Sequence, residues 1–267
     1  MTSETRVIAG RNPVLEALRA GRPVERLFIA KGASGGAIDE IIALARERGL
    51  SVQFDDRRRL DRLAEGHVHQ GVVAVAAPVP YVPVDEMLAR AEARGEAPLL
   101  LALDEVQDPH NLGSLLRSAD GGQAHGRTLP KRRSAGLTVT VARTSVGAVE
   151  HVPVAQVPNL AQALAELKER GLWVAGADMA GSQDYWDADL RGPLVIVIGG
   201  EDKGLGRRVR ETCDFLVRIP MRGRINSLNA AVAGALLLFE SLRQRRGRSP
   251  SMDRVTFSGG NWLSRQD

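Results

Sequence analysis

The chain has 267 residues but only one cysteine, few aromatic residues and no long apolar run. With Cys213 as the single cysteine, no disulfide can form within the chain, which favours a reducing compartment and predicts a cytoplasmic protein. The longest nearly unbroken apolar run covers ten residues, 230–239, whereas a membrane-spanning helix needs about 20. The first residues also lack the apolar segment of a secretory signal. We therefore expect no membrane partner.

A strong excess of charge is missing as well. The formal net charge is +4, and residues 241–267 alone, with six arginines and two aspartates, account for it. The first 240 residues sum to zero, so net charge is weak evidence for an anionic partner. Aromatic residues make up 4% of the chain, so any recognition of nucleic acid should depend mainly on backbone and shape.

What is present is typical of a globular protein, with 43% apolar and 25% charged residues and enough length for one large or two ordinary domains. In residues 1–77 the periodicity predicts helices at 12–18, 37–48 and 57–63 and strands at 24–30, 51–54 and 71–77. Three prolines follow at positions 78, 80 and 83, where the chain must run extended. We predict a small α/β domain over 1–77 and a linker over 78–98.

Residues 99–246 predict a second α/β domain. The pattern indicates strands at 99–103, 126–129, 172–175, 194–198 and 215–219, and helices at 85–94 in the linker and at 112–120, 160–170, 205–213 and 228–245. Such alternation implies a mostly parallel sheet with helices on both faces. Ligands then bind at the carboxyl ends of the strands. Residues 247–267 show no periodicity and are predicted to be a disordered tail.

A first polar cluster, residues 108–119, follows the strand that opens this domain. It contains Asn111, which we expect to cap the next helix, and Arg117, six residues further on, which can line the same cleft. As isolated residues they indicate only an N-cap and a surface arginine.

A second cluster, residues 198–206, is a glycine-rich turn directly after the most apolar strand, with Gly199, Gly200 and Glu201. It is not a phosphate-binding Walker loop, because Lys203 is followed by glycine rather than by serine or threonine. Glycines after a strand can also form no more than a tight turn.

A third cluster, residues 219–233, places Met221, Ser227 and Asn229 before an alanine-rich helix. Each of these residues alone means little. The three clusters in this order, each just beyond a strand, are much more specific.

Together the clusters resemble the SpoU/TrmH class of RNA ribose 2′-O-methyltransferases, over about residues 99–245. Residues 10–18, Gly-Arg-Asn-Pro-Val-Leu-Glu-Ala-Leu, and 69–73, His-Gln-Gly-Val-Val, are similar to the small RNA-binding domain, itself similar to a ribosomal protein, of some members. Those members methylate a guanosine in the peptidyl-transferase region of 23S rRNA, and Lys-Arg-Arg-Ser-Ala at 131–135 is typical of them. The resemblance implies a deep trefoil knot in the catalytic domain, a homodimer, and S-adenosylmethionine as cofactor.

Carried over position by position, the resemblance implies a catalytic set of Asn111, Arg117, Glu201, Ser227 and Asn229. It implies that the cofactor lies against Gly199, Gly200, Ile219, Met221 and Leu228. Glycine lets the chain approach a folded cofactor closely.

The weakly acidic 2′-hydroxyl needs a group that takes or polarises its proton. Because a guanidinium stays protonated, we expect Arg117, held by Glu201 and Asn111, to bind a neighbouring phosphate and polarise the hydroxyl. In a homodimer, Arg117 could come from the partner.

Two basic runs are candidate RNA contacts. These are Arg57, Arg58 and Arg59 in the first domain, which could equally form a solvated face, and Lys131, Arg132 and Arg133 in the second. His67 and His69 lack a surrounding group of Cys, Asp or Glu, so no metal site is predicted. Trp173 is expected in the core, and Cys213 is expected to be inert packing.

Residues 121–130 depart from the family, because Gln123, Arg127 and Thr128 stand where Gly, Val and Ile are expected. A buried arginine without a partner costs several kcal/mol. The sequence therefore predicts one of three outcomes: an exposed strand, local disorder, or impaired packing and cofactor access.

Methylation of a 23S rRNA guanosine is the favoured function, because the extra amino-terminal domain argues for ribosomal RNA. A transfer-RNA ribose methyltransferase and a non-catalytic RNA-binding or ribosome-assembly protein stay open. A nucleotide-binding enzyme that uses the glycine turn is disfavoured by the missing Ser or Thr after Lys203.

Overall fold

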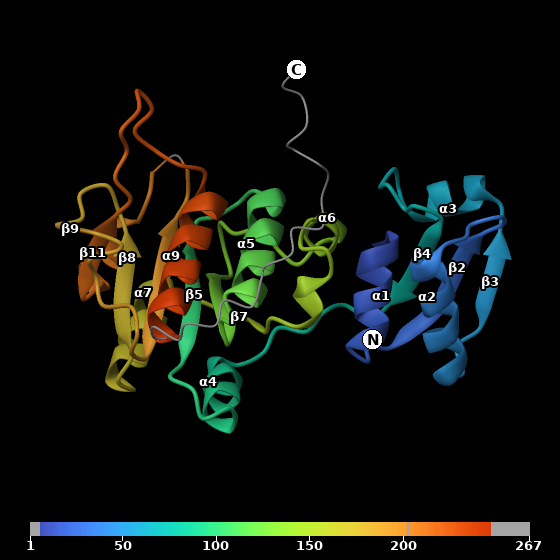
Figure 1. The fold of residues 1–267 in the computed structure, drawn as a ribbon, viewed down its shortest axis with the longest axis horizontal. Coiled ribbons are helices and arrows are strands. Elements are labelled where there is room, and N and C mark those ends of the chain that lie inside the picture. The colour runs from blue at the N-terminus through green and yellow to red at the C-terminus, as the bar shows by residue number, and fades with distance from the viewer. Residues whose placement is uncertain (1–5, 202, 247–267) are drawn as a thin grey trace, which may run out of the picture.

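The computed structural model describes residues 6–201 and 203–246, which form two β-sheets, each with its own helices (Figure 1). The predicted tail, 247–267, lies outside the described residues. None of the helices in the described part of the chain has the length and apolar character needed to cross a bilayer.

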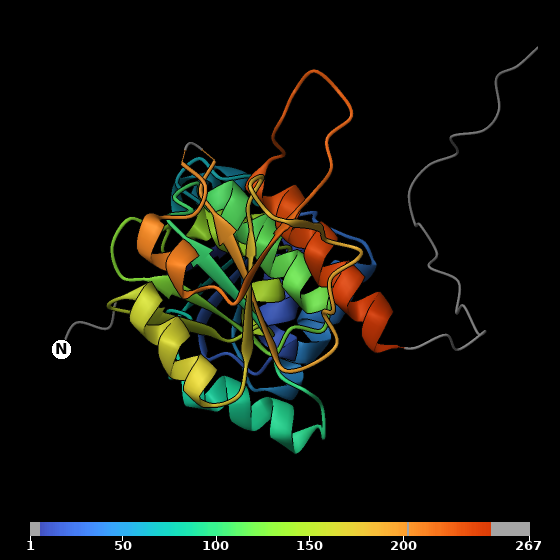
Figure 2. The same cartoon turned by 90° about the vertical axis from the view of Figure 1, so that its left-hand side faces the viewer.

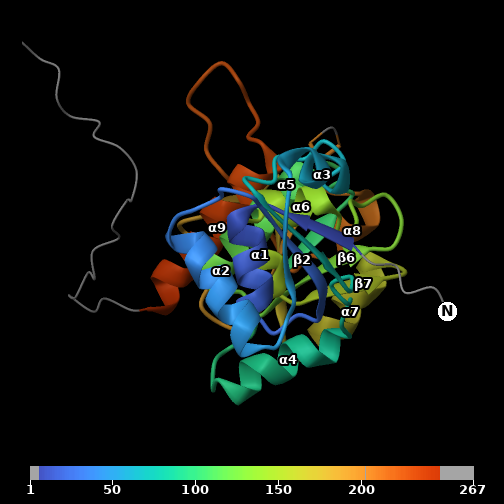
Figure 3. The ribbon, with the colours of Figure 1, turned by 90° about the vertical axis from the view of Figure 1, so that its right-hand side faces the viewer.

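The amino-terminal sheet has four strands in the order β1-β4-β2-β3. Its elements are β1 (Arg6–Ala9), α1 (Arg11–Arg19), β2 (Val24–Ala30), α2 (Gly36–Glu47), β3 (Val52–Asp55), α3 (Arg57–Leu63) and β4 (Val72–Ala76). β4 runs antiparallel to β1 and β2, and β3 runs parallel to β2. Helices α1 and α2 lie side by side against one face through Leu18 and Ile41, and α3 covers the other through Leu60 (Figure 3).

The second sheet has seven strands in the order β7-β6-β5-β10-β8-β11-β9, and every neighbouring pair is parallel. Its strands are β5 (Leu99–Asp104), β6 (Gly126–Pro130), β7 (Val154–Val157), β8 (Trp173–Ala177), β9 (Gln183–Asp184), β10 (Leu194–Gly199) and β11 (Phe215–Arg218). The predicted α/β class with a mostly parallel sheet is confirmed.

Helices cover both faces of this sheet (Figure 2). They are α4 (Val84–Ala93), α5 (Pro109–Gly121), α6 (Val139–Thr144), the 3-10 helix η1 (Ala148–Glu150), α7 (Leu160–Glu169), α8 (Arg207–Thr212) and α9 (Ala230–Arg245). One apolar core lies between the sheet and α5, α6 and α9, and the other lies between the sheet and α4, α7 and α8.

The two central strands end side by side, because Gly199 at the end of β10 pairs with Asp104 at the end of β5. The segments leading to α5 and to α8 therefore leave the sheet at one edge, which is formed by the carboxyl ends of the strands. The irregular segment 219–229, between β11 and α9, also starts there and projects beyond the sheet (Figure 2).

Arg127 resolves the question raised by residues 121–130. β6 forms its full ladders with β5 and β7, and Arg127 is 0% exposed, so the expectations of an exposed or locally disordered strand are wrong. Its Nη1 donates to the carbonyl of Leu112 at 3.2 Å. Its Nε and Nη2, and the hydroxyl of Thr128, have no hydrogen-bond partner among the described residues. The strand thus forms at a cost in unpaired polar groups.

The expectation that Trp173 lies in the core is wrong. The residue opens β8, opposite Leu194, and is 59% exposed, because it stands at the amino end of the strand rather than in its buried middle.

Candidate active site

The glycine turn after β10 folds back on itself. Gly204 donates its backbone N–H to the carbonyl of Gly200 at 2.9 Å and adopts a positive φ of 63°, where glycine is favoured. A Cβ on Gly199 would stand 2.2 Å from the carbonyl carbon of Gly204, so no other residue fits there without moving the turn.

Asp104 ties this turn to the end of β5. Its Oδ2 accepts the backbone N–H of Gly206 at 2.7 Å. Burial raises the pKa of this carboxyl above its ordinary value, and the Gly206 hydrogen bond partly offsets that rise. The sequence showed that the strand stops at Asp104 but gave no sign of this role.

Three of the predicted catalytic side chains meet at this edge of the sheet. Asn111 Nδ2 donates to Glu201 Oε1 at 3.0 Å, and Asn229 Nδ2 donates to the same oxygen at 2.6 Å. Asn229 Nδ2 also lies 2.8 Å from Asn111 Oδ1. Residues 118 and 28 positions apart are therefore joined into one hydrogen-bonded cluster, which we call the amide–carboxylate cluster.

Helix ends hold the two amides of this cluster. Asn229 is the N-cap of α9, and its Oδ1 accepts the N–H groups of Ala231 and Val232. The expectation that Asn111 caps α5 is wrong, because the cap is Asp108, whose carboxylate accepts the N–H of His110 at 2.9 Å. That hydrogen bond lowers the pKa of Asp108. With Asp108 as the cap, Asn111 lies in the first turn and is free to reach Glu201.

A cavity of about 280 Å³ lies beside the cluster. All five predicted cofactor residues line it, together with Glu201 and Ser227: Gly199, Gly200, Ile219, Met221 and Leu228. Sequence reasoning missed Asp178, Met179, Lys203 and Arg210, which also line it. Lys203 lies within the second cluster, so its position did carry a signal, whereas Asp178 and Met179 follow β8, where no polar motif stands out.

The cavity suits a cofactor with a flat ring and a chain that carries a sulfonium. Its wall is largely aliphatic, with Ile198, Val217, Ile219 and Leu228, and the glycines bare the backbone at Gly199 and Gly200. Apolar walls with a few convergent polar groups are the usual composition of a small-molecule site. The residues present therefore fit S-adenosylmethionine.

A second hollow of about 340 Å³ adjoins the first. Asp108, Asn111 and Glu105 line it, and it shares Gly200, Glu201, Lys203, Gly204 and Ala230 with the cofactor cavity. Glu201 of the amide–carboxylate cluster thus lines both hollows, as a group that contacts both a cofactor and a second substrate must.

Arg117 is not part of this arrangement within the chain. It is exposed on α5 and lines neither hollow, and Glu201 Oε1 is occupied by two amides instead. The reason is helical geometry, because six residues place Arg117 about 120° around α5 from Asn111. The expected contact of Arg117 with Glu201 and Asn111 is not found among the described residues.

The three arginines of the first basic run differ in their surroundings. Arg57 lines a hollow of the first sheet, whereas Arg59 pairs with Asp55 at 2.8 Å and lies over the ring of Phe28. Arg58 is exposed.

The second run lies nearer to the active site. Lys131, Arg132 and Arg133 are exposed after β6, and Arg133 bonds Glu105 of the second hollow at 2.9 Å.

His69 has a structural role. Its Nε2 lies 2.9 Å from Asp61 Oδ1, and its Nδ1 accepts the N–H of Gly71. Across 6–201 and 203–246, no three His, Cys, Asp or Glu side chains gather closely enough to hold a metal ion.

Comparison with known proteins identifies the family. Residues 98–239 match the SpoU rRNA methylase family, and residues 7–82 match the substrate-binding domain of RNA 2′-O ribose methyltransferases. A TrmH family tRNA/rRNA methyltransferase of Bacillus subtilis is 46% identical over 245 residues, covering 92% of this chain and 98% of the relative.

Solved structures agree with the sequence relatives. The SpoU methyltransferase AviRb of Streptomyces viridochromogenes, in complex with AdoMet, superposes with a TM-score of 0.76 at 27% identity, covering 91% of both chains. An AdoMet-bound rRNA methyltransferase of Sinorhizobium meliloti gives 0.74 at 26% identity, covering 90% of this chain and 87% of its own. A TrmH/SpoU tRNA modifying enzyme of A. aeolicus gives 0.52 at 26% identity and covers 61% of this chain and 84% of its own.

The chain therefore belongs to the SpoU/TrmH family of RNA 2′-O-ribose methyltransferases, whose cofactor is S-adenosylmethionine.

Proposed function

We propose that this enzyme methylates the ribose 2′-hydroxyl of a guanosine in 23S rRNA. Support comes from chain coverage: the S. meliloti rRNA methyltransferase covers 90% of this chain, whereas the A. aeolicus tRNA modifying enzyme covers 61%. The substrate-binding domain at residues 7–82 thus accompanies the rRNA-directed relative. An enzyme with this substrate works in the cytoplasm.

We divide the chain into an RNA-binding domain over 1–77, a linker over 78–98 and a catalytic domain over 99–246. The two family matches, 7–82 and 98–239, support this division. The trefoil knot that the family resemblance implies is part of the proposal for the catalytic domain.

The observation that carries the proposed chemistry is the amide–carboxylate cluster, whose Glu201 lines both hollows. S-adenosylmethionine supplies an electrophilic methyl group, which the ribose oxygen must approach in line with the breaking carbon–sulfur bond. Gly199, Gly200, Ile219, Met221 and Leu228 hold the cofactor at the first hollow. Fixing the two reactants in this geometry supplies much of the rate enhancement.

The remaining residues act on the ribose. Glu201, oriented by Asn111 and Asn229, positions the 2′-hydroxyl at the second hollow. Ser227, which lies on the same segment as Asn229, also acts on the ribose. Arg117 binds the neighbouring phosphate and polarises the hydroxyl, since a guanidinium cannot act as the base.

Arg117 can reach an active site only from a partner subunit. α9 exposes an apolar stripe, which comprises Val232, Leu236 and Phe239. A Cβ on Gly121 of α5 would stand 3.3 Å from Phe239, and Gly121 lies one helical turn from Arg117. A second copy seated on this stripe would lie beside Arg117, which supports a homodimer that shares its active sites.

Methyl transfer from radiolabelled S-adenosylmethionine tests the function. Protein-free 23S rRNA and bulk tRNA are offered separately to the wild type, to Asn111→Ala and to Glu201→Ala. Label in 23S rRNA with the wild type alone supports the proposal. Label in tRNA alone would show that the substrate is tRNA rather than 23S rRNA. No label in either RNA favours a non-catalytic RNA-binding protein.

A further inference from the structure

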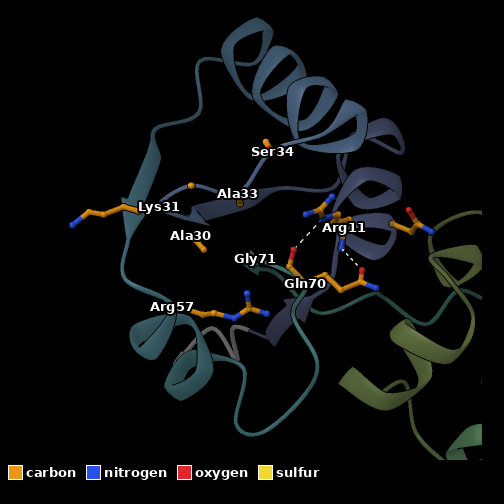
Figure 4. Close-up of a pocket in the computed structure, with 10 residues that line it drawn as sticks. Arg11, Ala30, Lys31, Ala33, Ser34, Arg57, Gln70 and Gly71 are labelled. Atoms are coloured by element: carbon orange, nitrogen blue, oxygen red, sulfur yellow. Dashed lines mark hydrogen bonds between the residues drawn. The ribbon is translucent and has the colours of Figure 1, made fainter.

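A further hollow lies in the amino-terminal domain, at one end of its four-stranded sheet (Figure 4). Its volume is about 600 Å³, larger than either hollow at the active site. The start of α1, the turn after β2, the start of α3 and the turn before β4 enclose it. We call it the arginine hollow.

Two guanidinium groups give the hollow its charge. Arg11 and Arg57 extend toward its middle from α1 and α3, whereas Lys31 extends away (Figure 4). Lys31 pairs loosely with Asp56 at 3.3 Å, and both side chains are exposed. No Asp or Glu is among the described residues that line the hollow. Arg57 bonds no side chain or carbonyl in the described part of the chain, so its full set of donors faces solvent.

Arg11 is fixed in place before any ligand arrives. Its Nε donates to the carbonyl of Gln70 at 3.0 Å, and its backbone N–H donates to Gln70 Oε1 at 3.3 Å. The remaining nitrogens of the guanidinium point along the hollow. A preorganised cation loses less entropy when it binds an anion than a mobile one does.

Small residues keep the hollow open. A Cβ on Gly71 would stand 3.1 Å from Cβ of Ala33, and one on Gly35 would stand 3.3 Å from Nη1 of Arg11. A side chain at Gly71, which lines the hollow, would therefore crowd Ala33, and one at Gly35, next to the lining residue Ser34, would crowd Arg11. No aromatic side chain is among the described residues that line it, so a stacked base gains little there.

We infer that the arginine hollow binds the sugar–phosphate backbone of the substrate RNA, with Arg11 and Arg57 bracketing one phosphodiester group. This inference rests on the proposed function. Arginine suits a phosphate because its planar fork donates two parallel hydrogen bonds. A contact of this kind recognises the path of a folded RNA strand rather than its sequence, and holds the target ribose near the catalytic domain.

Arg57→Gln is the main test, since within residues 6–201 and 203–246 the Arg57 side chain makes no bond whose loss would disturb the fold. Arg46→Gln is the matched control, because it removes the same charge away from the hollow. Arg46 lies near the end of α2, ten residues and about 15 Å along the helix from its first residue, Gly36. The readouts are the Kd for the RNA that the wild type methylates, its dependence on salt, and KM and kcat for methyl transfer.

We expect Arg57→Gln to weaken RNA binding roughly tenfold and to reduce the slope of log Kd against log salt by about 1. KM for RNA should rise while kcat and the Kd for S-adenosylmethionine stay unchanged. Arg57→Lys should restore part of the affinity, and Arg11→Gln should act in the same direction. Millimolar inorganic phosphate or guanosine monophosphate should compete only weakly, because a single phosphate group lacks the further contacts that a continuous RNA strand makes.

Equal RNA affinities and salt slopes for Arg57→Gln and Arg46→Gln would overturn the inference. Strong competition by guanosine monophosphate would also overturn it, and would indicate a site for a free nucleotide. A wild type that neither binds nor methylates RNA would instead reject the proposed function, so the two failures can be told apart.

Discussion

At the scale of single residues, Asn229 has two tasks that can be separated. Its Oδ1 caps α9, and its Nδ2 donates to Glu201. Asn229→Asp keeps the cap but removes the donor and places a second carboxylate beside Glu201. We expect methyl transfer under single-turnover conditions to fall by about 100-fold, the scale of losing one positioned group, while Tm changes little.

Asn159→Asp is the control for this prediction. Asn159 caps α7 in the same way, through its Oδ1 and the N–H of Gln162, and lines neither hollow of the active site. Its substitution should leave the rate unchanged. A similar loss of rate in both variants would show that the effect comes from the caps.

Arg127 is a buried cation with two unpaired nitrogens, and burial lowers its pKa to about 9. Replacing such a group with an apolar residue of similar volume is often stabilising by about 1–4 kcal/mol. We therefore expect Arg127→Met to raise Tm by several degrees in calorimetry. Arg127→Lys, which keeps the charge and loses donors, should lower it. A lower Tm for Arg127→Met would contradict this reading.

His125 makes stability depend on pH. Burial lowers its pKa below the ordinary value, with Arg94 and Arg245 acting in the same direction and Glu96 opposing them. Its Nδ1 accepts the N–H of Leu99 and so carries no proton. The unfolded chain then binds the proton more tightly, so this contribution is complete above pH 6.5 and is lost as pH falls below it.

We therefore expect the Tm of the wild type to fall between pH 7.5 and 5.5 more steeply than that of His125→Gln. Parallel Tm curves for the two proteins would show that His125 does not titrate in this range.

The thiol of Cys213 packs against the core between the sheet and α4, α7 and α8, and we expect it to be unreactive. Burial raises its pKa to about 11, with Asp214 adding to the rise. The thiolate, which is the reactive form, is therefore scarce at neutral pH.

At the scale of elements, several segments could be predicted closely, whereas some short edge strands could not. The strand at 24–30 and the helix at 57–63 agree with the structure to the residue. β1 and β7 each have four residues and lie at the edges of their sheets, so neither shows enough periodicity. α6 reads Val-Thr-Val-Ala-Arg-Thr, whose β-branched residues favour a strand, but the hydroxyl of Thr138 caps it as a helix.

The candidate site could be located from sequence, but its bonds could not. Motifs beyond neighbouring parallel strands must meet at one edge, which brings Asn111, Glu201 and Asn229 together. Which residue caps α5 depends on a shift of three positions that only the backbone geometry decides. That shift also leaves the side-chain amide of Asn111 free to bond Glu201.

The glycine turn gives a prediction about cofactor binding. Gly199→Ala would force a Cβ to within 2.2 Å of Gly204, so the turn must move and the cavity wall with it. We expect affinity for S-adenosylmethionine, measured by calorimetry, to fall at least tenfold. Gly192→Ala, where an added Cβ meets nothing within 4 Å, is the control and should bind normally. Unchanged binding by Gly199→Ala would place the cofactor elsewhere.

At the scale of the whole molecule, ionisable side chains that no local pattern predicts as partners join the amino-terminal domain to the region of η1 in the second domain. Arg22 bonds Glu150 at 2.5 Å with both side chains almost fully buried, and it also donates to the carbonyl of Ala77. His151 lies 2.8 Å from Glu16 on α1. The partners in these pairs are 128 and 135 positions apart, so periodicity could not link them.

The proposed homodimer gives a prediction at the same scale. Leu236 lies in the exposed stripe of α9, so Leu236→Glu places a charge where a second copy would bury it. We expect the wild type to sediment as a dimer, and Leu236→Glu as a monomer with activity reduced at least tenfold, because Arg117 can then no longer reach an active site. A dimeric Leu236→Glu protein would contradict the proposed interface.

The central claim is ribose methylation of one guanosine in 23S rRNA, and alkaline hydrolysis of labelled product tests it most directly. A 2′-O-methyl group blocks cleavage of the adjacent phosphodiester, since that cleavage requires a free 2′-hydroxyl. The account predicts that all label runs in a single alkali-resistant dinucleotide that contains 2′-O-methylguanosine. Label released as a mononucleotide with the methyl group on its base would contradict it.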